Sequence, residues 1–281
     1  MSASLLVIAC GATRDHDAPP PPEAAAAREY LSRAAAARRF LGGVATTTAR
    51  RRRFVSAPSV VRFRQVEYRA VVYNMGTERP FALFGTTTRT VRFTRTSGAT
   101  VVDSESPLRF ASAGAVAAWR ASGAPRLPLH ESHHRRYDVP AGEYSFAARG
   151  ESFTYADIRR LDGSPATARA VRARLGPSSG AANARQYAFL VSSAPLRPAA
   201  RAALVRAMAA VPGMHLCGER DDVADRHGRR AVCVGDGLRD YKFVFDARAR
   251  LRAIEERLVA PSPTLPTVPP GAVVQRDAFF T

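Results

Sequence analysis

Apolar and polar residues alternate along the stretch Val60–Val102, which is the pattern of β-strands with one exposed face. Residues 90–94 (TVRFT) show the alternation most clearly. Similar short segments, 241–246 and 251–259, follow a turn at Gly235–Gly237. We therefore expect antiparallel strands in the first half of the chain and an antiparallel meander near its end.

Helical patterns with start and stop signals lie before, between and after these strands. The predicted helices are Glu23–Leu41, Ala113–Ser122, Ser152–Leu161, Pro165–Leu175 and Ala199–Val211. Gly42 and Gly43 are expected to end the first helix. Ser112 is a predicted N-cap, and Thr154 with Asp157 has the spacing of a capping box. The mixture predicts an α+β fold with one domain over residues 23–259, followed by a proline-rich C-terminal tail at 260–281.

The N-terminal segment resembles a bacterial lipobox, in which an exported chain is acylated on a cysteine. The apolar run Leu5–Ala9 ends at Cys10, and Gly11 follows. A polar spacer then ends in Pro19–Pro22, which is stiff and extended. Residues 1–22 are thus predicted to be an export segment and tether that holds the chain at a membrane surface through lipidated Cys10. The alternative is an ordinary apolar N-terminus beside a chance cysteine.

The two other cysteines, Cys217 and Cys233, are placed for a disulfide. They flank the polar stretch Asp221–Gly228, which is expected to be a hairpin loop, and their positions are symmetric about it. Cysteines that face each other across a hairpin are close enough to bridge. A disulfide agrees with an exported protein, whereas two reduced cysteines in the core of a cytosolic protein are the alternative.

The formal net charge of +18 points to anionic partners. All but one of the 42 basic residues are arginine, however, and this bias accompanies a composition rich in alanine, glycine and proline. The densest run of positive charge is Arg50, Arg51, Arg52 and Arg53. It is a candidate surface for anionic head groups or an anionic polymer, or else a solvated loop.

No constellation of residues predicts catalysis, a metal or a cofactor. The cluster His130, Glu131, His133 and His134 lies beside arginines in an expected loop, where the positive charge disfavours a metal ion. Ser178 in a Gly-Pro-Ser-Ser-Gly run lacks the strand and helix that a nucleophile elbow needs. Asp221, Asp222 and Asp225 lack the spacing of a calcium loop. The protein is therefore predicted to be non-enzymatic.

The order of segments resembles a family of actinobacterial envelope proteins of uncharacterised function. The resemblance covers roughly residues 24–280, and the stretch Pro198–Leu251 carries it best, through PAARAALVRAMAAVPGMHL and the later DYKFVFDARARL. The cysteine pair and the lipobox-like segment, in place of a membrane helix, depart from the family pattern. The family resembles in turn the half-barrel fold of periplasmic lipoprotein carriers and sigma-factor regulators. The resemblance implies a curved antiparallel sheet with helices packed on one face.

A curved sheet covered by helices leaves an apolar concavity, which can hold an acyl chain. The candidate lining residues are Phe81, Leu83, Phe84, Val91, Phe93 and Trp119. The same side chains would otherwise fill a solid core. We therefore expect a membrane-tethered, extracytoplasmic protein that binds a lipid or acylated ligand, or senses envelope state with a regulatory partner. The alternative is a basic surface that binds a wall polymer or, less expected, nucleic acid.

Overall fold

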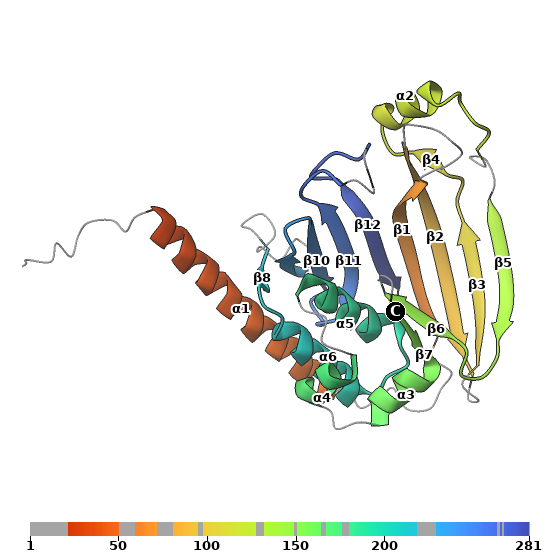
Figure 1. Cartoon of the computed structure of the whole chain (residues 1–281). Helices are drawn as coiled ribbons and strands as arrows, with labels where there is room; N and C mark the ends of the chain where they lie inside the picture. Colours follow the sequence, from red (N-terminus) through yellow and green to blue (C-terminus); the bar gives the residue numbers. More distant parts are fainter. Residues whose placement is uncertain are drawn as a thin grey trace, which may run out of the picture.

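The computed structural model shows a mixed α+β fold with antiparallel sheets and six helices (Figure 1). The residues that it describes are 22–50, 60–71, 81–94, 98–127, 132–148, 151–163, 167–175, 180–217, 229–262, 265 and 267–280. The predicted α+β class is therefore observed.

A ten-stranded antiparallel sheet forms one layer, and most of its strands follow the order β5-β3-β2-β1-β12-β11-β10-β9-β8. Its strands are β1 (Val60–Val71), β2 (Phe81–Phe93), β3 (Ala99–Glu105), β4 (Arg109–Phe110), β5 (His133–Val139), β8 (His215–Leu216), β9 (Arg230–Gly235), β10 (Arg239–Phe245), β11 (Leu251–Leu258) and β12 (Val273–Phe280). The short β4 pairs with β2 beside that path, and β6 (Ser145–Ala148) pairs with β7 (Glu151–Thr154) in a separate hairpin.

Helices pack against this sheet and against one another (Figure 1). They are α1 (Pro22–Arg50), α2 (Ala113–Ala121), α3 (Tyr155–Gly163), α4 (Ala168–Leu175), α5 (Ala181–Ser193) and α6 (Pro198–Ala209). Helix α5 lies against the sheet, α6 packs on α5, and α1 packs on α6. The largest core cluster lies between these layers and includes Tyr187, Leu204, Phe243 and Phe245.

The sequence analysis did not predict α5, although α5 is the most deeply buried helix. Ten of its thirteen residues are buried, so its sequence has no polar stripe that would mark an amphipathic helix. Buried Arg185 lies 3.2 Å from Asp277 of β12 and 3.7 Å from Glu256 of β11, and Arg239 also pairs with Glu256. These ion pairs connect α5 to the sheet, and each of the three buried charges, Arg185, Glu256 and Asp277, has a partner of opposite charge.

Helix α1 continues past the two glycines that were expected to end it. It extends from Pro22 to Arg50, and Gly42 and Gly43 lie in its interior. Leu41, Val44 and Ala45 beside them are buried. The prediction was wrong because tertiary packing of these apolar residues outweighs the low helix propensity of glycine.

The predicted caps of two other helices are confirmed. The Ser112 side chain accepts a hydrogen bond from the Ala115 N–H at the start of α2. At α3, the Thr154 N–H donates to Asp157 at 3.0 Å, and the Asp157 N–H donates to the Thr154 hydroxyl at 3.3 Å. The fourth helix begins at Ala168, where Thr167 accepts a hydrogen bond from Ala170. Pro165, where this helix was expected to begin, lies outside the described residues.

Three expectations about the sheet need correction. No sheet of the described residues is closed or strongly curled, so the expected half-barrel is not observed. The segment assigned to a proline-rich tail contains β12, which lies between β1 and β11 in the middle of the sheet. The histidine segment expected as a charged loop forms the edge strand β5 from His133 onward, and it pairs with β3.

Candidate functional site

A pocket of about 340 Å³ lies among α1, α5, α6 and the turn that joins β10 to β11. This volume falls at the lower end of the range for small-molecule sites. Its wall combines apolar side chains with the arginines Arg201, Arg248 and Arg250. The pocket is thus the described feature best suited to hold a small ligand with both an apolar and an anionic part.

The apolar wall comes from residues that also belong to the core. The buried residues of this wall are Val44 of α1, Val205 of α6, Phe245 at the end of β10 and Leu251 at the start of β11. Val191 near the end of α5 is partly buried and packs against the same cluster. Because these side chains are held by core packing, the pocket wall is formed before any ligand arrives.

Asp246 organises the turn between β10 and β11. One carboxylate oxygen accepts hydrogen bonds from the backbone N–H groups of Arg248 and Arg250, each at 2.9 Å. The other accepts from Nε of Arg250 and Nε of Arg252, also at 2.9 Å. Ala249, which lies between Arg248 and Arg250, has a φ of 56°. This is the left-handed region of the backbone, which residues other than glycine rarely adopt. The turn therefore presents Arg248 and Arg250 to the pocket in a defined conformation.

The electrostatics of this turn favour the charged carboxylate. Burial alone would raise the pKa of Asp246, but the hydrogen bonds from Arg250 and Arg252 outweigh it and hold the pKa below its ordinary value. Asp246 therefore stays ionised and keeps both guanidinium groups in place at neutral pH.

Arg201 on α6 is also held by the protein. Its Nε donates to the Leu196 carbonyl at 3.1 Å, and its Nη2 donates to the Ala194 carbonyl at 2.9 Å. Both carbonyls lie in the connection between α5 and α6. Arg201 and Arg250 thus approach the pocket from two different elements with their positions already set.

The structure does not bring the six predicted cavity residues together. Phe81 and Leu83 are buried in a small cluster under α2, against which Trp119 packs. Val91 and Phe93 belong to the main core, where Phe93 stacks on Phe146. Phe84 is partly exposed and follows Leu83 directly, so it points to the opposite face of β2. None of the six lines the pocket. They pack in two separate places because α2 covers one end of β2 while Tyr144 and Phe146 cover the other.

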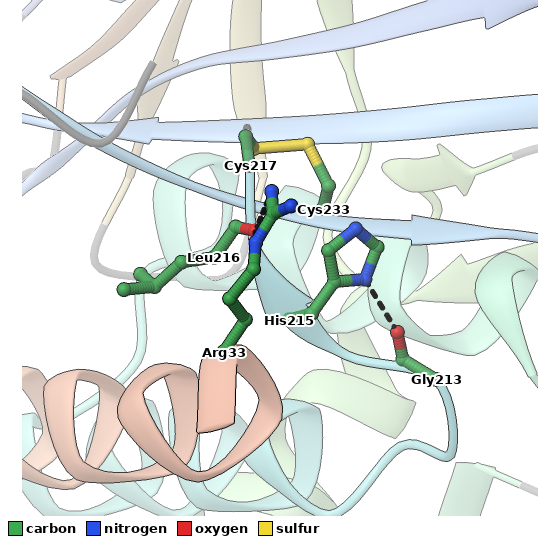
Figure 2. Close-up of a disulfide and its surroundings, with 6 residues drawn as sticks. All are labelled: Arg33, Gly213, His215, Leu216, Cys217 and Cys233. Atoms are coloured by element: carbon green, nitrogen blue, oxygen red, sulfur yellow. Dashed lines mark hydrogen bonds between the residues drawn. A yellow bond between two sulfur atoms is a disulfide. The ribbon is translucent and has the colours of Figure 1, made fainter. Parts of the chain in front are cut away.

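The predicted disulfide between Cys217 and Cys233 is present, with the two Cα atoms 5.2 Å apart (Figure 2). The register differs from the expectation, because Cys233 lies opposite His215 and not opposite Cys217. The bridge is therefore diagonal across the hairpin. Beside it, Arg33 of α1 donates from Nε and Nη2 to the Leu216 carbonyl at 3.2 and 2.8 Å, which ties α1 to the bridged segment (Figure 2).

Several other candidate residues lie outside the described residues. They are Cys10, Arg51, Arg52, Arg53, Ser178 and the three loop aspartates Asp221, Asp222 and Asp225. Arg50 is exposed at the last turn of α1. An anionic-polymer surface based on the arginine run thus stays a prediction.

The two described residues of the histidine cluster, His133 and His134, do not point to one site. His133 and His134 are neighbours on β5, so their side chains point to opposite faces of the sheet. His134 Nδ1 lies 2.8 Å from the Ser104 hydroxyl. His130 and Glu131 lie outside the described residues. Among the described residues, no group of three or more His, Cys, Asp or Glu side chains could hold a metal ion.

Sequence reasoning missed the pocket because its residues come from four separate elements. The turn segment FDARARL was noticed only as part of a family resemblance, although an aspartate followed by arginines at positions 248, 250 and 252 is a local signal of a braced basic turn. No protein-family model, curated protein or solved structure matches this chain. Within the described part of the chain, no helix has the length and apolar character needed to cross a membrane.

Proposed function

We propose that this chain is a non-enzymatic, membrane-tethered extracytoplasmic protein that binds a lipid or acylated ligand. The pocket among α1, α5, α6 and the β10–β11 turn carries the proposal. Its apolar wall suits a hydrocarbon chain, and its rim of arginines suits a polar end that remains near the surface.

The disulfide supports the proposed compartment. Structural disulfides persist mainly in oxidising surroundings, such as the outside of a bacterial membrane. The Cys217–Cys233 bridge also anchors the segment that Arg33 of α1 contacts. A chain that functions outside the cytoplasm would keep this bridge closed.

Helix α1 supports both the tether and a sensing role. Its N-terminal part extends away from the body of the protein (Figure 1), and residues 26–32 are exposed. At 29 residues α1 is about 43 Å long. The same helix contributes Val44 and Thr48 to the pocket. A membrane tether or an envelope regulatory partner at the N-terminal end of α1 would thus be joined by one continuous helix to two residues that line the ligand site.

A titration with the neutral fluorescent probe 1-aminoanthracene tests the binding proposal. We expect saturable binding by the full chain, weakened about tenfold by Ser192→Phe, which places a larger side chain at the pocket wall. Ala117→Phe, at an exposed position of α2, is the matched control and should bind as the unaltered protein does. Thermal melts confirm that both variants are folded. If the folded protein leaves the probe unbound, or if both variants bind equally well, the pocket is not a ligand site.

The intact mass of the chain from the membrane fraction of a high-GC Gram-positive host tests the proposed location. Diacylglycerol on Cys10 together with oxidised Cys217 and Cys233 is the expected result. A soluble chain with three free thiols would contradict the tether and the compartment.

A further inference from the structure

The chemistry of the pocket rim narrows the ligand class, and this inference rests on the proposed function. Three of the lining residues are the arginines Arg201, Arg248 and Arg250, and the described lining contains no aspartate or glutamate. Asp246, which does not line the pocket but pairs with Arg250, offsets part of this charge, and the rim keeps a net positive charge toward a ligand that enters. A cationic head group would be repelled by these charges and a neutral one could only accept weaker hydrogen bonds from them, whereas an anionic one would be attracted to them.

The arginines are suited to hold an anion because two of them are already oriented. Arg250 is braced through Nε by Asp246, and this contact occupies one of its five N–H donors. Arg201 is braced through two contacts to the carbonyls of Leu196 and Ala194. A guanidinium held in this way loses little side-chain entropy when it binds a carboxylate or phosphate.

The size of the pocket limits the apolar part of the ligand. A volume of about 340 Å³ is small for a lipid with two acyl chains. The apolar residues Val44, Val205 and Phe245 of one core cluster nonetheless line it, which suits a single hydrocarbon chain. We propose that the ligand is a single-chain amphiphile with an anionic head group, a carboxylate or a phosphate, held by Arg250 together with Arg201 and Arg248.

Displacement of bound 1-aminoanthracene by amphiphiles with the same tail tests this inference. The series is dodecanoate, dodecyl phosphate, dodecyl maltoside and dodecyltrimethylammonium, each below its micelle-forming concentration. We expect the two anions to displace the probe at concentrations about tenfold lower than the neutral and cationic compounds. The better of the two anions identifies a fatty acid or a phosphate-bearing lipid as the source.

Two variants locate the selectivity. Arg250→Gln is expected to abolish the preference for anions and to leave displacement by dodecyl maltoside unchanged. Arg248→Gln, at an exposed position of the rim, should reduce the preference without disturbing the fold. Arg257→Gln is the control, because it removes the same formal charge from an exposed position of β11 that does not line the pocket.

The outcomes separate this inference from the proposed function. Equal displacement by all four amphiphiles would overturn anion selectivity while the pocket would remain a ligand site. An unchanged preference in both Arg250→Gln and Arg248→Gln would overturn the assignment to the rim arginines. If 1-aminoanthracene does not bind the unaltered protein, the proposed function itself fails.

Discussion

At the scale of single residues, Asp246 organises the turn beside the candidate site. Its carboxylate accepts four hydrogen bonds within one turn, and two of the donors are the side chains of Arg250 and Arg252. The pocket therefore depends on a residue that does not itself line it. A short polar turn of this kind determines how Arg248 and Arg250 are presented to a ligand.

Replacement of Asp246 tests this role. Asp246→Asn keeps the shape of the side chain but removes its charge, and we expect a loss of about 1–3 kcal/mol of unfolding free energy at neutral pH. The folded-state pKa lies below the ordinary value of 3.8, so the carboxylate stabilises the protein above that pH. This contribution is lost as the pH falls through the lowered pKa.

Thermal melts between pH 6 and pH 3 should thus show a difference in Tm between the two proteins that shrinks below about pH 4. Asp240→Asn, an exposed residue of β10, is the matched control. A difference that stays constant over this range would contradict the ionic role of Asp246.

Local signals at the residue scale were predictable from sequence. Ser112 and the Thr154–Asp157 capping box act within one helical turn, so neighbouring residues suffice to identify them. The pocket arginines were not predictable in the same way. Arg201 and Arg250 become neighbours of one cavity only in the folded chain, where α6 and the β10–β11 turn both line it.

At the scale of elements, α1 and α5 show how tertiary packing overrides sequence pattern. Helix α5 lacks a polar stripe because it is covered on nearly all sides. Strand β12 was missed for a related reason. Its buried Asp277 interrupts the expected apolar alternation, and the contact with Arg185 of α5, which the local sequence does not reveal, compensates the charge at that position.

The glycines inside α1 give a prediction at this scale. A Cβ atom added at Gly42 or Gly43 would meet nothing within 4 Å, and neither glycine has a positive φ. Gly42→Ala and Gly43→Ala should each raise the unfolding free energy by about 0.5–1 kcal/mol in urea denaturation, because alanine costs less backbone entropy in a helix. Gly180→Ala is the opposite control and should destabilise, since Gly180 has a φ of 82°. Destabilisation by both α1 variants would show that the helix does not continue through these positions.

At the scale of the whole molecule, β12 joins the two halves of the sheet. It pairs with β1 on one side and with β11 on the other, although residues 60–71 and 273–280 lie far apart in the chain. Strand patterns alone predicted the C-terminal meander but could not predict this pairing, because register between distant segments depends on the assembled core.

The disulfide also acts on the whole molecule, because it closes a loop of the unfolded chain. Cys217 and Cys233 are separated by 16 residues in sequence. Replacement of both by serine should lower the unfolding free energy by about 3 kcal/mol in the chain-entropy model. Urea denaturation with and without reductant measures the effect. Reductant should destabilise the unaltered protein and leave the double serine variant unchanged, and equal stability under both conditions would contradict a structural role.

The most direct test of ligand binding by the whole molecule is photo-crosslinking with a diazirine-bearing fatty acid, followed by peptide mapping. We predict adducts on peptides that contain 44–48, 191–205 or 245–251, and competition by unlabelled dodecanoate. Labelling confined to other surfaces, or labelling that dodecanoate does not reduce, would contradict a lipid-binding pocket at this position.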